Sequence, residues 1–173
     1  MLYTKKGDDG STILFDAKKR ISKTLLIVEV LGAVDELNSL LGVCKVKADD
    51  LEIKEALEDL QQDLFVAQAE LAGAEPRITA DKITKLERDI NEIEKQLPVI
   101  KNFFVSGGTE LSALLDFARA VSRMVERAAV RLYDDGAMNK DLYSYLNRIS
   151  SFLYALARLT NQKSGIKEVR PHY

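Results

Sequence analysis

The sequence contains very few of the side chains on which most protein catalysis and metal binding depend. In 173 residues there is one cysteine, Cys44, and one histidine, His172. A single cysteine excludes an intrachain disulfide and any multi-cysteine metal site. The histidine lies at the extreme C-terminus, which disfavours a histidine-based triad and a zinc site.

The chain also lacks a strong excess of either charge and any long apolar segment. It has 25 basic and 27 acidic residues, so the basic excess typical of a nucleic-acid-binding protein is missing. No apolar run reaches the roughly 18 residues that a membrane span requires. The first residues, MLYTKKGDDG, lack the apolar core of a signal peptide. We therefore expect a soluble, cytoplasmic protein with no nucleic-acid or membrane partner.

Apolar residues recur at three- and four-residue spacing over most of the chain, without strand-like alternation, repeats or a domain linker. The pattern predicts helices at about 25–47, 50–73, 79–97, 109–135 and 139–163, with the third on the outside. The fold class is therefore all-α, a five-helix up-and-down bundle. We expect a single domain over 1–173, with a loop at 1–24, the bundle at 25–163 and a loosely attached tail at 164–173. Capping side chains stand at four of the expected helix starts, namely Asp49 or Asp50, Thr79, Thr109 and Asn139.

The fourth predicted helix carries a row of like charges. Arginines stand four residues apart along it, so their guanidinium groups share one side of the helix. Like charges at this spacing destabilise a helix by roughly 0.2–0.5 kcal/mol per pair. This arginine ladder consists of Arg119, Arg123, Arg127 and Arg131. The apolar stripe predicted to face the core consists of Leu114, Phe117, Val121, Val125, Ala128 and Leu132.

Two explanations of the ladder stay open at this point. It is either a solvated face answered by acids on a neighbouring helix, or a site for an anion or for a carboxylate brought from elsewhere. In sequence, only Asp116 and Glu126 are near enough to relieve the arginines. In the first helix, Asp35 and Glu36 follow Gly32, a glycine better explained by close packing or ligand approach than by helix propensity. These two acids are candidates to meet the ladder.

The segment 1–24 does not have a helical pattern. Gly7 and Gly10 interrupt it, while Ser11, Thr12 and several lysines supply hydrogen-bond donors. A loop of this composition is able to wrap phosphates, because small residues expose backbone N–H groups and lysine adds positive charge. It is not a Walker A loop, which needs GxxxxGK[ST]. Taken alone, the phosphate signal is weak, and an exposed basic N-terminal arm explains the segment as well.

Four blocks of the sequence form an ordered combination. They are Thr4-Lys5-x-Gly7-Asp8-x-Gly10, Gly32-x-Val34-Asp35-Glu36-Leu37-Asn38, Phe103-x-x-x-Gly107-Gly108 followed by Ala118-Arg119-x-Val121-x-Arg123-x-x-Glu126-Arg127, and Tyr145-Leu146-Asn147-Arg148. With these blocks in this order, the chain resembles the PduO-type ATP:cob(I)alamin adenosyltransferases over nearly its full length. Each block alone is a modest signal, but their combination is specific.

The resemblance implies a ferritin-like five-helix bundle that assembles as a homotrimer, with active sites between subunits. It implies transfer of the 5′-deoxyadenosyl group of ATP to the cobalt of cob(I)alamin, with release of triphosphate and with magnesium on the phosphates. Cob(I)alamin is itself a strong nucleophile, which agrees with the scarcity of catalytic side chains. A reductase and an adenosylcobalamin-dependent enzyme are further implied partners. The ATP-binding positions implied are Thr4, Lys5, Gly7, Thr12, Lys23, Arg123, Glu126, Arg127 and Asn147.

The resemblance also implies residues for the corrinoid and for catalysis. The corrinoid is expected over Phe103, beside Gly107 and Gly108, and Asp35 of one subunit is expected to pair with Arg119 of the next. Several positions depart from the usual family pattern and leave rate and corrinoid preference open. They are Lys6 for threonine, Val30-Leu31 for alanine and an aromatic, Ser106 for proline, Asp116 for histidine and Met124 for arginine.

Two other classes of protein stay open from the sequence. One is a helical scaffold or adaptor whose charged faces bind a partner, which would need neither the N-terminal loop nor the glycine pair. The other is a different enzyme that uses a nucleoside triphosphate on the same bundle. A nucleotide-binding assay separates the scaffold from both enzymes.

Overall fold

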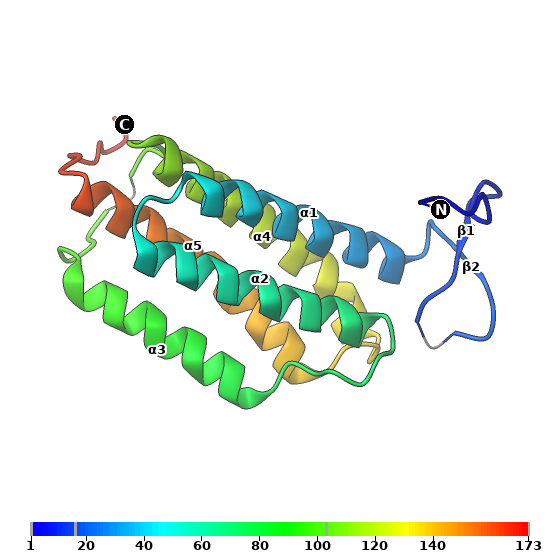
Figure 1. Ribbon diagram of the computed structural model, residues 1–173. Coiled ribbons are helices and arrows are strands. Elements are labelled where there is room, and N and C mark those ends of the chain that lie inside the picture. The colour runs from blue at the N-terminus through cyan, green and yellow to red at the C-terminus, as the bar shows by residue number, and fades with distance from the viewer. Residues whose placement is uncertain (1, 16, 103, 173) are drawn as a thin grey trace.

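The computed structural model describes residues 2–15, 17–102 and 104–172, and within them five helices form a bundle (Figure 1). The prediction of an all-α five-helix fold is confirmed. A small hairpin in the N-terminal segment was not foreseen, because its two-residue strands carry no alternating pattern. The elements are β1 (Ser11–Thr12), β2 (Ile21–Ser22), α1 (Leu26–Lys47), α2 (Leu51–Leu71), α3 (Ala80–Gln96), α4 (Glu110–Asp134) and α5 (Lys140–Lys163).

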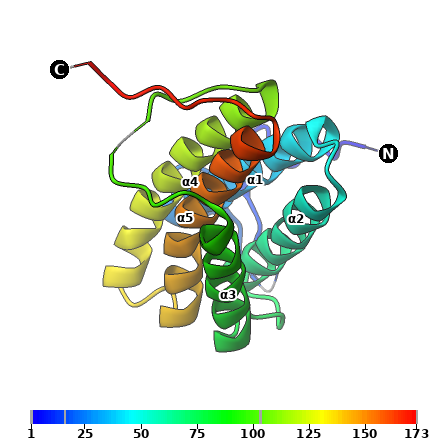
Figure 2. The same cartoon turned by 90° about the vertical axis from the view of Figure 1, so that its left-hand side faces the viewer.

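The helices run along a common axis, with α3 at the periphery. α1 packs against α2 and α4, α4 packs against α5, and α3 packs mainly against α5 (Figure 2). Only Leu86 and Ile93 of α3 are buried, whereas α5 has a broad buried face. The prediction that the segment 79–97 lies on the outside is therefore confirmed.

Part of the buried face of α4 is shifted by one residue along the sequence from the predicted apolar stripe. Phe117 was expected in the core, but 58% of its surface is exposed. The buried face instead contains small residues such as Ala118, Ser122 and Ala129. Small side chains let α4 approach its neighbours closely. The larger Phe117 lies about 100° around the helix from Ala118 and is available to something outside the protomer.

Three of the four predicted caps are present. The side chain of Thr109 accepts a hydrogen bond from the N–H of Ser112 (3.0 Å) in a reciprocal capping box. The side chains of Asp50 and Asn139 cap α2 and α5, accepting from the N–H groups of Ile53 (3.1 Å) and Leu142 (2.8 Å), without a reciprocal bond. Thr79 makes no side-chain cap bond, so that prediction is wrong. The start of α3 is exposed, and water is able to satisfy its free N–H groups.

The C-terminal segment is tied to the bundle, contrary to the expectation of a loosely attached tail. The N–H of Val105 donates to the carbonyl of Val169 (2.9 Å). Glu168 forms an ion pair with Arg158 of α5 (2.7 Å). The arginine is 2% exposed, so its buried charge requires carboxylate partners, and the tail supplies one of them.

Replacing Tyr145 by phenylalanine should lower the free energy of unfolding by about 1.5–3 kcal/mol, the usual range for one hydrogen bond to a charged group. The Tyr145 hydroxyl is buried and donates to Asp63 (2.8 Å), which also pairs with Lys82. Burial, together with the Asp63 carboxylate, raises the pKa of Tyr145, so the phenol remains a donor. Urea unfolding measures the change. Tyr133→Phe is the matched control, because Tyr133 is more exposed; equal losses in both variants would contradict a role for the Asp63 contact.

Candidate functional site

The four arginines of the ladder have different surroundings. The Nε atom of Arg119 lies 3.9 Å from the Asp116 carboxylate, and a guanidinium nitrogen of Arg131 lies 3.7 Å from Glu29 of α1. In the part of the chain that the structure describes, neither Arg123 nor Arg127 forms an ion pair with an acid, and both are exposed. Acids of the same protomer therefore explain the ends of the ladder but not its two middle members.

Beside these two arginines, α4 and α5 bring together two of the predicted ATP-binding residues. The side-chain amide of Asn147 donates to Glu126 (2.9 Å). The guanidinium group of Arg148 donates to the side-chain amide oxygen of Asn147 (2.8 Å). Hydrogen bonds to both the nitrogen and the oxygen of this amide therefore set its orientation. The hydroxyl of Tyr143 adds a longer hydrogen bond to Glu126 (3.4 Å). We call Glu126 and Asn147 the Glu126–Asn147 pair.

Tyr143 and its neighbour Tyr133 were not identified from the sequence. Their rings stack with centroids 4.7 Å apart. Desolvation, with the Glu126 carboxylate, raises the pKa of Tyr143, which keeps the phenol protonated and able to donate. The spacing of Tyr143 and Asn147, four residues apart on one helix, was the available signal, because such residues share a face.

The predicted phosphate-binding residues of the N-terminal segment lie in one compact loop. The ammonium group of Lys23 donates to the carbonyl of Gly7 (3.0 Å). A Cβ atom at Gly7 would lie 3.0 Å from that ammonium nitrogen, so the close approach favours glycine. Lys5 has a φ of 61°, which is uncommon for a residue other than glycine. The loop also contains Thr4, and Thr12 on β1.

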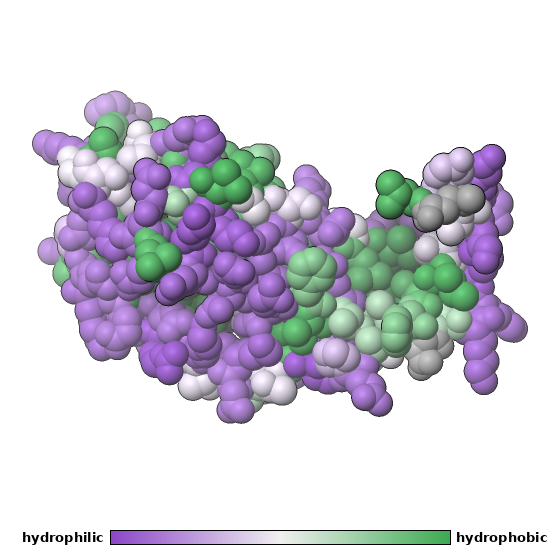
Figure 3. Space-filling model, viewed as in Figure 1, coloured by the Kyte–Doolittle hydropathy of each residue, from purple (hydrophilic) through white to green (hydrophobic). Residues whose placement is uncertain are grey.

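This loop projects from the bundle instead of packing against it (Figure 1). Among the described residues, no hydrogen bond or ion pair joins residues 2–22 to α2, α3, α4 or α5. Apolar side chains are exposed between the bundle and the tip of the loop (Figure 3). Phe15, in the loop between β1 and β2, is 81% exposed. The loop leaves at the end where Glu29 meets Arg131, but among the described residues it forms no hydrogen bond or ion pair with Arg123 or Arg127 of the same protomer.

The glycine pair before α4 has a structural role of its own. Gly107 and Gly108 have φ values of 119° and 123°, which side chains rarely adopt. A Cβ atom at Gly108 would overlap the side-chain amide of Asn161. That amide donates to the carbonyl of Gly107 (2.9 Å), and the N–H of Gly107 donates to Asp116 (3.1 Å). The turn is therefore held by α4 and α5, while Phe103 lies outside the described residues.

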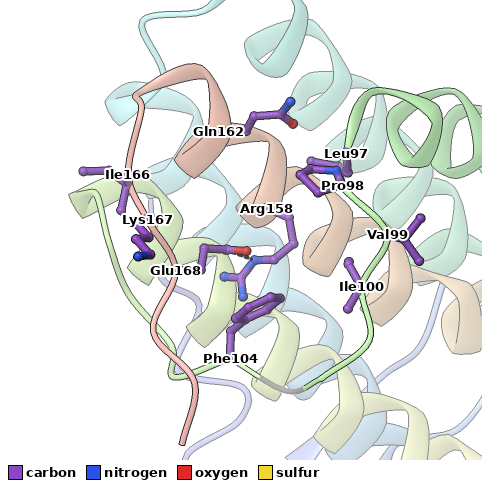
Figure 4. A pocket seen from close by; sticks show the side chains of 10 residues that line it. All are labelled: Leu97, Pro98, Val99, Ile100, Phe104, Arg158, Gln162, Ile166, Lys167 and Glu168. Carbon is purple, nitrogen blue, oxygen red and sulfur yellow. Dashed lines mark ion pairs between the residues drawn. The ribbon is translucent and has the colours of Figure 1, made fainter.

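A cavity of about 270 Å³ lies next to this turn (Figure 4). Its walls come from the α3–α4 connection, from α5 and from the tail, with Arg158 between Phe104 and Glu168. The turn and Arg123 are 15 residues apart along α4, or about 22 Å at 1.5 Å per residue. One protomer therefore keeps the expected corrinoid residues and the expected ATP residues at separate places.

Among the described residues, the remaining reactive side chains do not form a second candidate site. Cys44 is buried, and burial raises the pKa of its thiol to about 11, which leaves it protonated at neutral pH. The described residues contain no group of three or more His, Cys, Asp or Glu side chains arranged to hold a metal ion. Among the described helices, none is long and apolar enough to cross a bilayer.

The fold and these residues define a class, a helical bundle with a row of arginines on one helix and a basic loop that reaches away from the bundle. Residues 2–160 match the family described as cobalamin adenosyltransferase. The chain therefore belongs to the cobalamin adenosyltransferase family, as the four sequence blocks indicated.

Several relatives share this assignment. The corrinoid adenosyltransferase PduO of Salmonella typhimurium is 36% identical over 99% of the chain, which spans 54% of that relative's length. A corrinoid adenosyltransferase of Bacillus subtilis is 34% identical over 97% of this chain and 90% of its own. A phenylalanine-to-alanine variant of a PduO-type ATP:corrinoid adenosyltransferase from Lactobacillus reuteri, solved with cobalamin and ATP, has a TM-score of 0.94 at 29% identity, with full coverage of both chains. The chain thus spans about half the length of the first curated relatives it matches.

Proposed function

We propose that this protein transfers the 5′-deoxyadenosyl group of ATP to the cobalt of cob(I)alamin, giving adenosylcobalamin and triphosphate. One observation carries the proposal beyond family membership. Arg123 and Arg127 are exposed, have no acidic partner among the described residues, and flank the Glu126–Asn147 pair. Such guanidinium groups suit a polyphosphate, because each presents several donors in a fixed plane.

The reaction requires orientation and charge stabilisation from the protein. Co(I) supplies the electron pair for the new cobalt–carbon bond at the 5′ carbon, and the bond from that carbon to oxygen breaks. The departing triphosphate takes the electron pair of the broken bond. Arg123 and Arg127 stabilise the charge that develops on this leaving group, and the loop holds the nucleotide in line. No protein base or nucleophile is needed, which agrees with the protonated Cys44.

The ATP site is formed by two protomers. The loop of one protomer supplies Thr4, Lys5, Gly7, Thr12 and Lys23, and α4 and α5 of its neighbour supply the arginines and the Glu126–Asn147 pair. The projection of the loop, with its exposed Phe15, supports this arrangement, because among the described residues this basic loop forms no hydrogen bond or ion pair with α2, α3, α4 or α5 and leaves apolar side chains exposed. A magnesium ion would be held mainly by the triphosphate oxygens, since the described residues contain no metal cage.

The assembly we propose is a homotrimer in which α1 and α4 face the next subunit. A side chain at Gly32 would meet nothing within 4 Å in its own protomer. Asp35 is exposed and forms no ion pair among the described residues, and the buried Nε atom of Arg119 has no hydrogen-bond partner there. Asp35 and Arg119 of adjacent subunits would satisfy each other. Large apolar side chains exposed on these two helices are Val43, Val46, Phe117 and Met124.

Replacing Asp35 by asparagine should weaken the trimer and lower activity together, each by roughly tenfold, because it removes the carboxylate charge proposed to face Arg119 across the interface. Light scattering measures the assembly. Glu36→Gln is the matched control, since Glu36 is the adjacent exposed acid. Reversing both charges, in the variant D35R/R119D, should partly restore assembly if the pair is coupled. A fully active monomer would contradict the proposal.

The corrinoid site we propose lies at Phe103, Gly107 and Gly108. The cavity beside the glycine turn supports this location, because its walls are largely apolar and include Phe104 and Ile100. Aromatic and aliphatic walls with a few polar groups are typical of sites for large organic ligands.

Anaerobic incubation with ATP and chemically reduced cobalamin tests the function. We expect the absorbance change of cobalt–carbon bond formation, with one triphosphate released per corrinoid, and no change when ATP is omitted. Nucleotide binding without a new cobalt–carbon bond would favour a different enzyme that uses a nucleoside triphosphate. The absence of nucleotide binding would favour a helical scaffold.

A further inference from the structure

Four charged side chains of alternating sign form a continuous chain from α4 to the C-terminal tail. The Asp116 carboxylate lies 3.9 Å from Nε of Arg119 and accepts a hydrogen bond from Arg158 (2.9 Å). Nε of Arg158 lies 2.7 Å from Glu168. This last contact is an ion pair and not a linear hydrogen bond, because the N–H does not point at the carboxylate oxygen. The formal charges of these four side chains sum to zero.

The two middle members of this row of four charged side chains are buried. Asp116 is 4% exposed and Arg158 is 2% exposed. A charge in such surroundings is tolerated only with close partners, and removal of one partner leaves the other uncompensated. The Arg158 guanidinium also lies over the rings of Tyr154 (4.8 Å) and Phe104 (5.9 Å), which fixes it further.

The chain of charges is connected directly to the glycine turn. The same Asp116 oxygen that binds Arg158 accepts the N–H of Gly107 (3.1 Å). The Asn161 amide donates both to the Gly107 carbonyl (2.9 Å) and to Glu168 (3.1 Å). A tail residue, Glu168, thus shares its partners with the backbone of the turn before α4.

We infer that Asp116 and Glu168 are positioning residues, which act through Arg158 to fix the Gly107–Gly108 turn and the tail against one another and so set the shape of the corrinoid side of the site. The inference rests on the proposed function. Arg158 reaches the cavity wall at Phe104, so a displacement of its guanidinium is transmitted to the wall as well as to the turn.

The effect should be selective for one substrate. In the described residues, none of Asp116, Arg158 and Glu168 forms a hydrogen bond or ion pair with Arg123 or with the Glu126–Asn147 pair. Loss of a carboxylate charge from the chain should therefore weaken the interaction with the corrinoid and leave ATP binding unchanged.

Glu168→Gln and Asp116→Asn are the test variants, because each keeps the size of the side chain and removes its charge. Glu168 lies outside the helices, so its variant retains the fold even if the buried Asp116→Asn variant does not. Glu94→Gln is the control, a matched change at an exposed acid of α3. Hydrogen–deuterium exchange of the segment 104–108 is measured first, without substrates. We expect exchange at the Val105 and Gly107 amides to become about tenfold faster in Glu168→Gln, the size expected when one charge-assisted contact is lost.

Steady-state kinetics with each substrate varied in turn supply the second readout. For Glu168→Gln we expect the KM for cob(I)alamin to rise about tenfold, with the KM for ATP within twofold of the wild type. Glu168→Asp, which keeps the charge, should recover part of the loss. Unchanged hydrogen–deuterium exchange at 104–108 would overturn the coupling between Glu168 and the glycine turn. Faster exchange with an unchanged KM for cob(I)alamin would show that the four charged side chains stabilise the structure without positioning the corrinoid. A wild-type protein that does not use cob(I)alamin would refute the proposed function and the positioning role together, while the exchange data would still decide the coupling.

Discussion

Alanine at Arg123 should lower kcat/KM by about 10²-fold, the usual cost of removing one preorganised donor that stabilises transition-state charge. Arg123 is exposed and has no acidic partner among the described residues, so its removal breaks no ion pair of the fold. We therefore expect unchanged helix content and an unchanged free energy of unfolding. Contacts made only with the departing triphosphate would appear as a lower kcat, and contacts made already with bound ATP would appear as a higher KM.

Arg131→Ala is the matched control for this experiment. Arg131 belongs to the same ladder, two turns further along α4, but it faces Glu29 and is not a predicted ATP-binding residue. Its variant should keep most of the activity. Lys5→Ala should resemble Arg123→Ala, because Lys5 belongs to the loop that we propose completes the site. If kinetics and calorimetry of both variants matched the wild type, Arg123 and Lys5 would be ordinary surface charges.

Replacing Phe103 by alanine should abolish the four-coordinate cobalt signal of bound cob(II)alamin while ATP binding persists. Removal of an axial ligand makes reduction to Co(I) easier, and an aromatic ring beneath the corrin excludes water and the dimethylbenzimidazole base without offering a lone pair. Burial of such a ring is favourable by about 1.5–3 kcal/mol. Removing the ring should therefore readmit an axial ligand and lower activity. The loss should be largest when the assay starts from Co(II) with a mild reductant.

Electron paramagnetic resonance of the Phe103→Ala protein with ATP and cob(II)alamin measures this coordination directly. Phe65→Ala is the control, because Phe65 lies on α2 with 58% of its surface exposed. Supplying Co(I) directly should restore much of the activity of the Phe103 variant. An unchanged four-coordinate signal would contradict a role of Phe103 in the coordination of cobalt.

The helices could be predicted from the sequence because their limits depend on local signals. The capping side chains of Asp50, Thr109 and Asn139 act within one turn, and the predicted limits of α1 and α5 lie close to the observed ones. The face of α4 was harder to predict. Apolar residues follow two sides of that helix, and only the approach of α1 and α5 decides that Ala118 is buried and Phe117 exposed.

Only the parts of the site that lie within recognisable sequence motifs could be predicted. The ladder and the Asn147 block are visible in the sequence, but which arginines lack acidic partners depends on tertiary contacts such as that of Arg131 with Glu29. The pairing of Asp116 with Arg158 joins residues 42 positions apart, and without the fold Arg158 resembles any charged residue on a helix. For the same reason, the ion pair by which Glu168 holds the tail in place could not be predicted from sequence.

The projecting loop has a consequence for how activity depends on protein concentration. If the loop of one protomer completes the phosphate site of another, a dissociated subunit retains its helices but has only half of the groups that bind ATP. Dilution below the dissociation constant should then reduce specific activity without unfolding the bundle. Nucleotide, by bridging two chains, should favour reassociation through mass action. The supply of product would then respond to the abundance of the protein more steeply than in proportion.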